Sequence, residues 1–166
     1  SIYYIKNKDK IRLSNKEYRD NPENKEIIRT SQRKYEKKHP LYGRIRCSIK
    51  RIIREENAGE SKPINKYGIR VKDIIIKLKA DAIKYGYSTK EMIELNYHID
   101  HIIPISFYNL KDKAEIRKCC NPLNLRWLPA DENLSRGNRI RPEDLEIIKT
   151  LPKEIYPKGM RESGLV

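Results

Sequence analysis

Apolar residues recur at helical spacing in two stretches of the chain. The first stripe predicts a helix over residues 41–56, and its members are Leu41, Ile45, Ile49, Ile52 and Ile53. The second predicts a helix over residues 71–85 that stops at Gly86, with Ile74, Ile75, Leu78 and Ala82 facing inward. Both stripes are broad enough to be buried, so they predict a helical core.

Terminal signals define further helices. Asn21 is a suitable cap and Pro22 a suitable first-turn residue for a helix that runs to about residue 38, before Pro40. Ser88 and Glu91 have the spacing of a capping box for a short helix to about residue 95. Residues 1–20 have little periodicity, and we expect them to be extended, or ordered only on a partner.

The second half of the chain predicts short elements of both kinds. We expect strands from Tyr97 and over 123–128, with Trp127 as a core anchor, a loop over 57–66, and an irregular tail after residue 150. Short helices are expected over 112–120, 129–137 and 142–150. The predicted fold class is therefore α+β, with a mainly helical, basic N-terminal region.

Positive charge is concentrated near the N-terminus. The chain of 166 residues has a net charge of +14, and its first 50 residues contain 15 Lys+Arg against 6 Asp+Glu. Such a distribution suggests a polyanionic partner, most often nucleic acid. A charge run taken alone favours a solvated helical surface, and the motif described below moves the interpretation to nucleic acid. The basic faces of helix 41–56 are the predicted DNA-binding surface, with Arg44, Arg46, Lys50, Arg51 and Arg54. The polar helix before it either lies along DNA or braces the rest of the protein.

Several classes of protein are disfavoured by the composition. No apolar run reaches the roughly 18–20 residues that span a bilayer, so we expect no membrane contact. Without a secretory signal, the odd number of cysteines favours a reducing cytoplasm. No Cys-x-x-Cys pair is present, so no structural zinc is expected, and Cys119 or Cys120 is expected to pack inward.

A motif whose side chains could take part in catalysis or metal binding begins at Tyr97 and reads Tyr-His-Ile-Asp-His-Ile-Ile-Pro. A second part runs from Asn121 to Asn138 and contains Asn-Leu and Asp-Glu-Asn. A carboxylate and an amide oxygen can hold a divalent cation, and an imidazole can take a proton from water. Asp100 and His101 would point to opposite faces of a regular strand, so both can serve one phosphate only where the strand bends or ends.

The whole segment from about residue 67 to 139 resembles the HNH endonucleases of phages and mobile elements, whose core is a ββα-metal (His-Me) finger. The resemblance implies that Asp100 and Asn133 bind Mg²⁺ or Mn²⁺ and that His101 is the general base. It also implies that Asn124 braces the finger and helps to orient the base. The implied segments are a DNA-binding extension over 1–66, a nuclease core over 67–141 and a C-terminal tail over 142–166.

Further side chains near the motif are weaker candidates. Arg126, Arg136 and Arg139 are expected to grip phosphate, because guanidinium pairs bidentately with phosphate oxygens. His98 is a possible accessory residue, since it shares a strand face with Asp100.

The predicted function is hydrolysis of phosphodiester bonds in double-stranded DNA. A homing-type or phage nicking enzyme is favoured over a restriction endonuclease, which would act as a dimer on a short site, and the choice between monomer and homodimer is open. Two other classes also stay open: a non-catalytic DNA-binding protein that keeps the finger as a scaffold, and a protein that acts on RNA.

Overall fold

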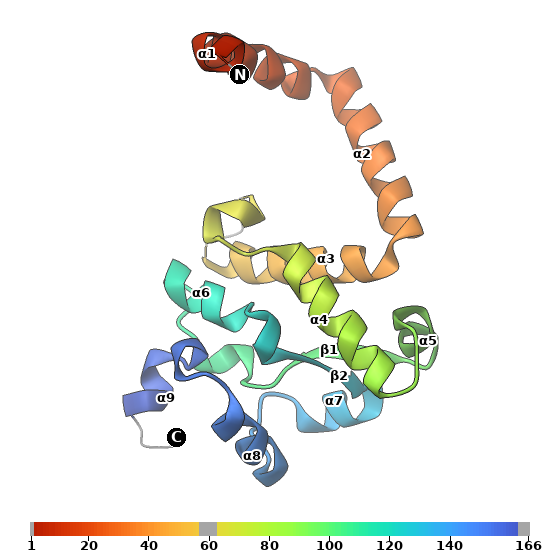
Figure 1. Ribbon diagram of the computed structural model, residues 1–166, viewed down its shortest axis with the longest axis vertical. Coiled ribbons are helices and arrows are strands. Elements are labelled where there is room, and N and C mark those ends of the chain that lie inside the picture. Colours follow the sequence, from red (N-terminus) through yellow and green to blue (C-terminus); the bar gives the residue numbers. More distant parts are fainter. Residues whose placement is uncertain (1, 57–62, 163–166) are drawn as a thin grey trace. The chain divides into compact units, whose positions relative to one another are not determined.

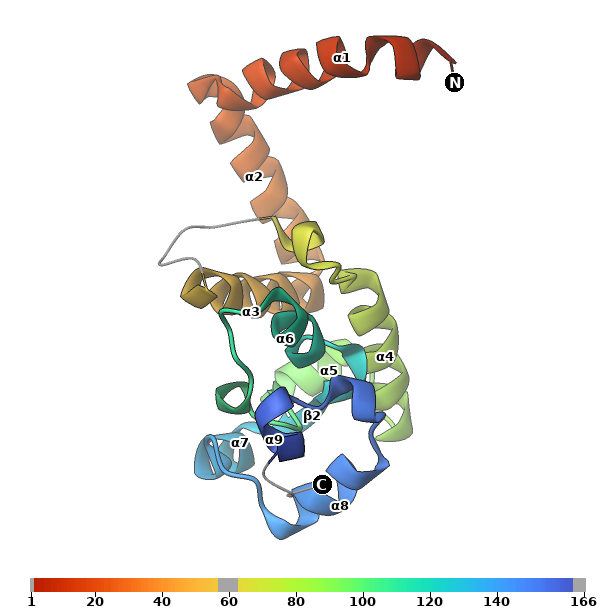
Figure 2. The ribbon, with the colours of Figure 1, turned by 90° about the vertical axis from the view of Figure 1, so that its left-hand side faces the viewer.

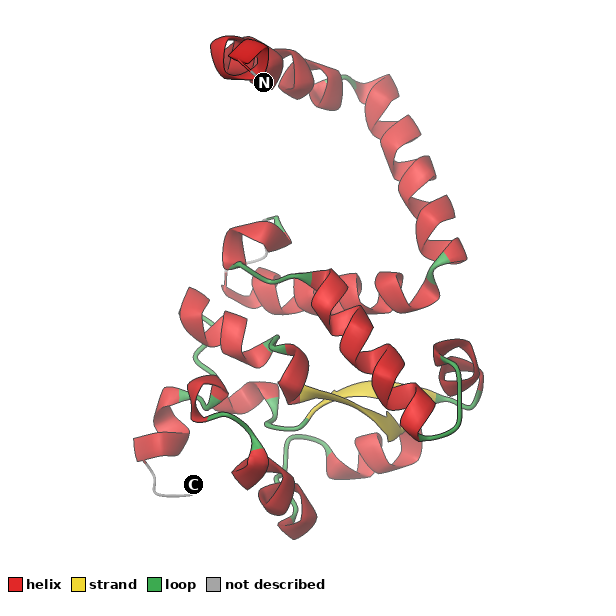
Figure 3. Ribbon diagram, in the orientation of Figure 1, coloured by secondary structure: helices red, strands yellow, loops and turns green. Residues whose placement is uncertain are grey.

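The computed structural model describes residues 2–56 and 63–162 (Figure 1). The described chain is mainly helical and contains one antiparallel sheet of two strands, which confirms the predicted α+β class (Figure 3). It divides into two compact units, residues 1–40 and 41–166. The units part at residue 40, whereas the expected first boundary was residue 66, because the helix that follows Pro40 packs into the core of the second unit.

The first unit consists of α1 (Ile2–Asp20) and α2 (Pro22–Lys38). The expectation of extended chain over residues 1–20 was wrong. That stretch contains no Gly or Pro and is rich in good helix formers, so it is helical without an apolar stripe. The start of α2 is as predicted: the Asn21 side chain accepts a hydrogen bond from the Glu23 amide at 2.9 Å.

The core of the second unit is built around α3 (Pro40–Glu56) and α4 (Val71–Lys84). All five apolar residues of the predicted α3 stripe are buried, as are Ile74, Leu78 and Ala82 of α4, while Ile75 is partly buried. Trp127 is the predicted core anchor, and its indole nitrogen donates to the Leu78 carbonyl at 2.9 Å. Helix α4 therefore packs against the second strand (Figures 1 and 2).

The sheet consists of β1 (Tyr97–His101) and β2 (Leu125–Pro129). In its antiparallel register Asp100 lies opposite Arg126, and His101 lies opposite Leu125. Among the described residues β1 pairs only with β2, so its other edge is unpaired. Strand β1 ends at His101, three residues before Pro104, which meets the condition for Asp100 and His101 to reach one place.

Short elements connect these parts. They are η1 (Ile64–Tyr67), α5 (Thr89–Glu94), η2 (Ile105–Phe107), α6 (Lys113–Cys119), η3 (Pro122–Asn124), α7 (Ala130–Arg136), α8 (Pro142–Thr150), η4 (Lys153–Ile155) and α9 (Lys158–Glu162). Four differ from the prediction. Residues 122–124 form a 3-10 turn instead of the start of a strand, and the C-terminal tail is helical over 153–155 and 158–162. The predicted loop over 57–66 is 3-10 helical from Ile64, and residues 57–62 lie outside the described ranges.

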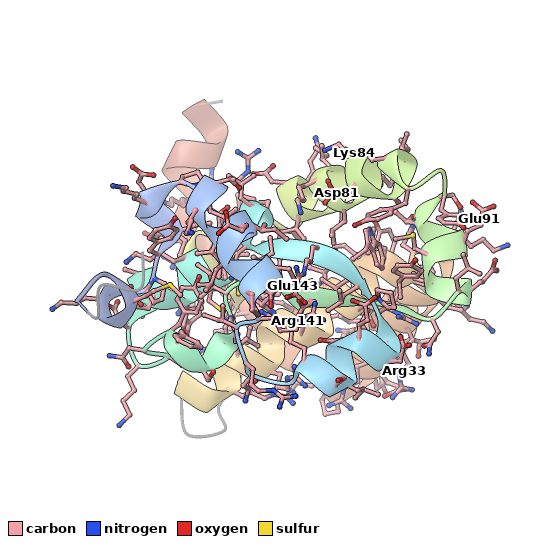
Figure 4. All side chains as sticks on the ribbon, turned by 90° about the horizontal axis from the view of Figure 1, so that it is seen from below. Arg33, Asp81, Lys84, Glu91, Arg141 and Glu143 are labelled. Carbon is pink, nitrogen blue, oxygen red and sulfur yellow. The ribbon has the colours of Figure 1, made fainter. Side chains whose placement is uncertain are left out.

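Polar contacts lie near the start of α5 and the end of α4, and Figure 4 labels Glu91, Asp81 and Lys84 among the residues that make them. The capping box predicted for α5 is confirmed, because Ser88 and Glu91 each accept a hydrogen bond from the other's amide. The amide of Ser88 lowers the pKa of Glu91. On α4, Asp81 pairs with Lys77 at 2.6 Å and with Lys84 at 3.6 Å. None of the described helices is long and apolar enough to cross a membrane.

Candidate functional site

Two adjoining hollows lie along β1, between α3 and α7. The strand-end hollow has a volume of about 150 Å³ and is lined by the end of β1, the turn after it, Arg51 of α3 and residues of α7 and its C-terminal end. The mid-strand hollow has a volume of about 450 Å³ and is lined by α3 residues together with His98 of β1 and Asn133 of α7. Arg51, Ile99 and Asn133 line both, so the two hollows form one groove along β1.

Three of the four residues of the predicted catalytic set meet in the strand-end hollow. Asp100 and His101 reach it from the end of β1, and Asn133 reaches it from α7. Gly137 ends α7 with a φ of +56°, a conformation that favours glycine, and Asn138 after it also lines this hollow. The fourth predicted residue, Asn124, is fully buried and is not among the lining residues.

His101 is held in its neutral form. Burial, aided by the positive charges of Arg51 and Arg136, lowers its pKa from the ordinary 6.5 to about 4. Its exposed fraction is only 9%. A neutral imidazole at the edge of a polar hollow can accept a proton from a water molecule near neutral pH.

Asp100 belongs to a closed ring of four charged side chains, here called the ion quartet: Asp100, Arg126, Asp144 and Arg136. Arg126 donates to Asp100 at 3.0 Å and to Asp144 at 2.7 Å. Arg136 donates to Asp144 at 2.8 Å and to the two oxygens of Asp100 at 2.9 and 3.0 Å. Two carboxylates and two guanidiniums therefore alternate, and the ring is neutral in sum.

Arg136 also holds the end of β1. Its guanidinium donates to the backbone carbonyls of His101 at 3.0 Å and of Ile102 at 2.5 Å. The exposed fraction of Arg136 is 2%. The expected contact of Arg136 and Arg126 with phosphate is therefore replaced by internal contacts, in which their guanidiniums are committed to carboxylates and backbone carbonyls.

The two carboxyls of the ion quartet differ in their electrostatic surroundings. Burial raises the pKa of Asp100, and the guanidiniums of Arg136 and Arg126 oppose that rise. Burial acts in the same direction on Asp144, but hydrogen bonds from the Arg141 amide and from Arg126 and Arg136 outweigh it, so the pKa of Asp144 lies below its ordinary value. Asp144 is therefore the firmly ionised anchor of the pair.

Asn124 braces the turn that follows β1. Its amide oxygen accepts from the Ile103 amide at 2.8 Å, and its amide nitrogen donates to the carbonyls of Cys119 at 3.0 Å and Ile103 at 3.3 Å. The Ile102 amide donates to the Asn124 carbonyl at 2.8 Å. These bonds tie the residues directly after His101 to the C-terminal end of α6.

His98 and Asn133 pair across the groove. The amide nitrogen of Asn133 lies 3.1 Å from Nδ1 of His98. This contact leaves the amide oxygen of Asn133 as the atom that a divalent cation would bind. The expected accessory position of His98 is thus beside a predicted metal ligand, in the mid-strand hollow.

The predicted basic surface residues have different surroundings. Arg44 and Arg51 line the groove. Arg46 instead donates to the Tyr42 hydroxyl at 3.0 Å and lies over its ring. Arg139 donates to the carbonyls of Ser135 and Arg136 at the end of α7. Lys50 and Arg54 are not among the described residues that line either hollow.

Asp100 and Asn133 line the same hollow, and each could offer one oxygen to a divalent cation. The Asp100 carboxylate already accepts three hydrogen bonds, and an ionised carboxylate offers about four acceptor positions, so one position remains. The described residues include no cluster of three His, Cys, Asp or Glu side chains that could hold a metal ion. Water and phosphate oxygens would have to complete the shell, as is usual for Mg²⁺. Cys119 and Cys120 are both buried.

Asp144 is the member of this site that sequence reasoning missed. It lies in the first turn of α8, where an acidic residue is normally explained by the helix dipole. Its side chain is completely buried against two arginines, and the Arg141 amide donates to it at 3.0 Å. Arg141 and Glu143, which lie near it at the start of α8, form an ordinary ion pair at 3.0 Å (Figure 4).

Comparisons with known proteins leave the family of the chain open. No family profile matches it, and no solved structure matches it. A stretch of 55 residues is 36% identical to "Uncharacterized protein L426" of Acanthamoeba polyphaga mimivirus. The match covers 33% of this chain and 24% of the viral protein, so the chain spans about a quarter of that relative.

Proposed function

We propose that this protein is a metal-dependent endonuclease that hydrolyses phosphodiester bonds of double-stranded DNA, with β1, β2 and α7 as a ββα-metal finger. The observation that carries the proposal is the meeting of His101, Asp100 and Asn133 in one polar hollow. The resemblance of residues 67–139 to HNH endonucleases names the same three side chains. With a pKa of about 4, His101 is neutral near pH 7, and the neutral form is the one that can accept a proton.

The proposed reaction is hydrolysis of a phosphodiester, in which a water oxygen replaces a sugar oxygen on phosphorus. His101 takes a proton from the water, whose oxygen forms a bond to phosphorus while the bond from phosphorus to a sugar oxygen breaks and the leaving oxygen is protonated. Arg51, in the same hollow, is placed to pair with a non-bridging phosphate oxygen. A bound Mg²⁺ or Mn²⁺ would stabilise the charge that develops on the phosphate and on the leaving oxygen.

The test is cleavage of supercoiled plasmid by the wild-type protein and by His101→Ala, each with Mg²⁺ and with EDTA. Conversion to open-circle or linear DNA is expected only for the wild type with metal, and the product distinguishes a nick from a double-strand break. His39→Ala is the matched control, because it removes an exposed imidazole of the other compact unit. Cleavage by His101→Ala at the wild-type rate would refute the assignment of the base.

A non-catalytic DNA-binding protein is the second candidate. It is favoured by the ion quartet, because two guanidiniums occupy most of the acceptor positions of the carboxylate that a metal would need. Retardation of DNA on a gel, without cleavage of a plasmid library that offers many target sites, would select this alternative.

A further inference from the structure

We propose that the mid-strand hollow binds the sugar–phosphate backbone of the DNA strand next to the phosphate that is cleaved, with Arg44 as its phosphate contact. This inference rests on the proposed function, and it adds the direction in which the cleaved DNA strand runs along the groove. The cleaved strand would leave the strand-end hollow towards the start of β1 and pass between α3 and α7.

The continuity of the two hollows is the first support. Arg51, Ile99 and Asn133 line both, so a strand whose phosphate lies beside His101 extends directly into the mid-strand hollow. Its volume of about 450 Å³ is three times that of the strand-end hollow, at about 150 Å³. It lies within the range of roughly 300–1,000 Å³ that is common for binding sites of small molecules, which is ample for one nucleotide unit.

The charge of the mid-strand hollow is the second support. Among the described residues that line it, Arg44 and Arg51 are charged and none is a carboxylate. Both arginines are exposed, and they lie seven residues apart on α3, about 10 Å along the helix axis. Ser48 lies between them on the same helix face and adds a hydroxyl donor. This row of donors is suited to successive phosphates of one strand.

The apolar part of the lining is the third support. Ile99 and the exposed Cys47 lie among these polar groups. A nucleotide unit also combines a charged phosphate with an apolar sugar face, whereas a free metal ion or a simple anion does not. The mixed lining therefore fits a sugar–phosphate unit better than an isolated ion.

The surroundings of Arg44 differ from those of the other arginines predicted to form the basic surface of α3. Arg46 is held by Tyr42, and Arg54 is not among the described residues that line the groove. If positive charge alone attracted DNA, Arg44 and Arg54 would contribute alike, since both are exposed on the same helix. If the hollow is a phosphate subsite, Arg44 contributes more.

The experiment measures binding of a duplex oligonucleotide to the full-length protein, with cleavage prevented by EDTA and, separately, by His101→Ala. Arg44→Ala is expected to weaken binding about fivefold to tenfold near 0.1 M salt, and to reduce the slope of log K against log salt by about one. Arg54→Ala is expected to have a clearly smaller effect. Arg70→Ala is the matched control, because Arg70 is an exposed arginine that pairs with Asp73 at the start of α4.

Placement of the subsite is tested with duplexes that carry one neutral methylphosphonate at successive positions beside the cleaved bond. The wild type should lose affinity at one such position, and Arg44→Ala should be insensitive to the same replacement.

Equal effects of Arg44→Ala and Arg54→Ala, with cleavage by the wild type intact, would overturn the subsite and leave the nuclease standing. A selective effect of Arg44→Ala in a protein that never cleaves would overturn the nuclease and leave the mid-strand hollow as a DNA-backbone site without an adjoining cleaved phosphate. A protein that binds no duplex would overturn both.

Discussion

At the scale of single residues, His101 combines two properties that usually exclude each other. It is almost completely buried, and it lines a polar hollow that solvent can reach. Burial and two nearby guanidiniums disfavour its charged form, so its pKa is about 4. The side chain is therefore a proton acceptor over the whole range above about pH 5, whereas an exposed histidine is half protonated near pH 6.5.

The pKa of His101 predicts how stability depends on pH. Between pH 6.5 and 4 this histidine binds a proton in the unfolded chain but not in the folded one, so stability falls as the pH falls through this window. One pKa unit corresponds to about 1.4 kcal/mol, so the full loss is on the order of 3 kcal/mol. Urea unfolding of the wild type and of His101→Asn at pH 7.5 and 4.5 measures it. The difference in free energy of unfolding between the two pH values should shrink in the variant. An equal difference in both proteins would contradict the buried, neutral histidine.

At the scale of secondary-structure elements, the ion quartet joins four of them. Asp100 comes from β1, Arg126 from β2, Arg136 from α7 and Asp144 from α8. Helix α8 has two further buried contacts, both made by Ile148. Its side chain lies in the core, and its backbone carbonyl accepts a hydrogen bond from the Tyr156 hydroxyl at 2.6 Å. The position of the predicted metal-binding carboxylate therefore depends on a helix outside the segment that resembles the nuclease finger.

Removing the charge of Asp144 should loosen this junction. Asp144→Asn leaves the buried guanidinium of Arg136 and the partly buried one of Arg126 with one carboxylate between them, and breaking a buried ion pair from one side costs about 3–5 kcal/mol. Urea unfolding measures the cost, and hydrogen exchange of the α8 amides locates it. Glu143→Gln is the matched control, because Glu143 is an exposed neighbour whose pair with Arg141 contributes little. Equal stability of Asp144→Asn and Glu143→Gln would show that the ion quartet does not hold α8.

At the scale of the whole molecule, charge and core are divided unequally between the compact units. The first 40 residues contain 12 Lys+Arg and 6 Asp+Glu, which is +6 of the net +14. Helix α2 has no buried residue, whereas the core cluster of buried residues lies entirely in residues 41–166. Among the described residues, the first unit therefore contributes mainly charge, and the second contributes the packed core and the candidate site.

A fragment of residues 41–166 is expected to fold without the first unit, because every described core residue is retained. Its melting temperature should stay within a few degrees of that of the full chain. If the first unit neutralises phosphates, the slope of log K for DNA against log salt should fall by about 0.9 for each lost contact. Thermal melting and binding titrations at several salt concentrations measure both. An unchanged slope would contradict a DNA-gripping role of residues 1–40.

Prediction from sequence succeeded where neighbouring residues decide the outcome. The stripe of α3, the Asn21 cap and the Ser88–Glu91 box each involve residues within a few turns of each other, and each was found as expected. It failed for residues 1–20, because the absence of an apolar stripe was treated as the absence of a helix, although propensity alone favours one. It also placed the start of β2 two residues too early, because residues 122–124 form a 3-10 turn that Asn121 caps.

The sequence by itself determined the elements and the chemical groups available to the site, because helix stripes, caps and strand ends depend on residues close in the chain. Only the tertiary structure decided which groups meet. Arg136 reaches Asp100 across 36 residues, and Arg126 reaches Asp144 across 18, so these pairs exist only after β1, β2, α7 and α8 have packed. For the same reason Arg136 and Arg126, predicted as surface contacts for phosphate, are internal partners of two carboxylates. A charged side chain removed from water needs a partner of opposite charge, and packing alone decides which partner lies within reach.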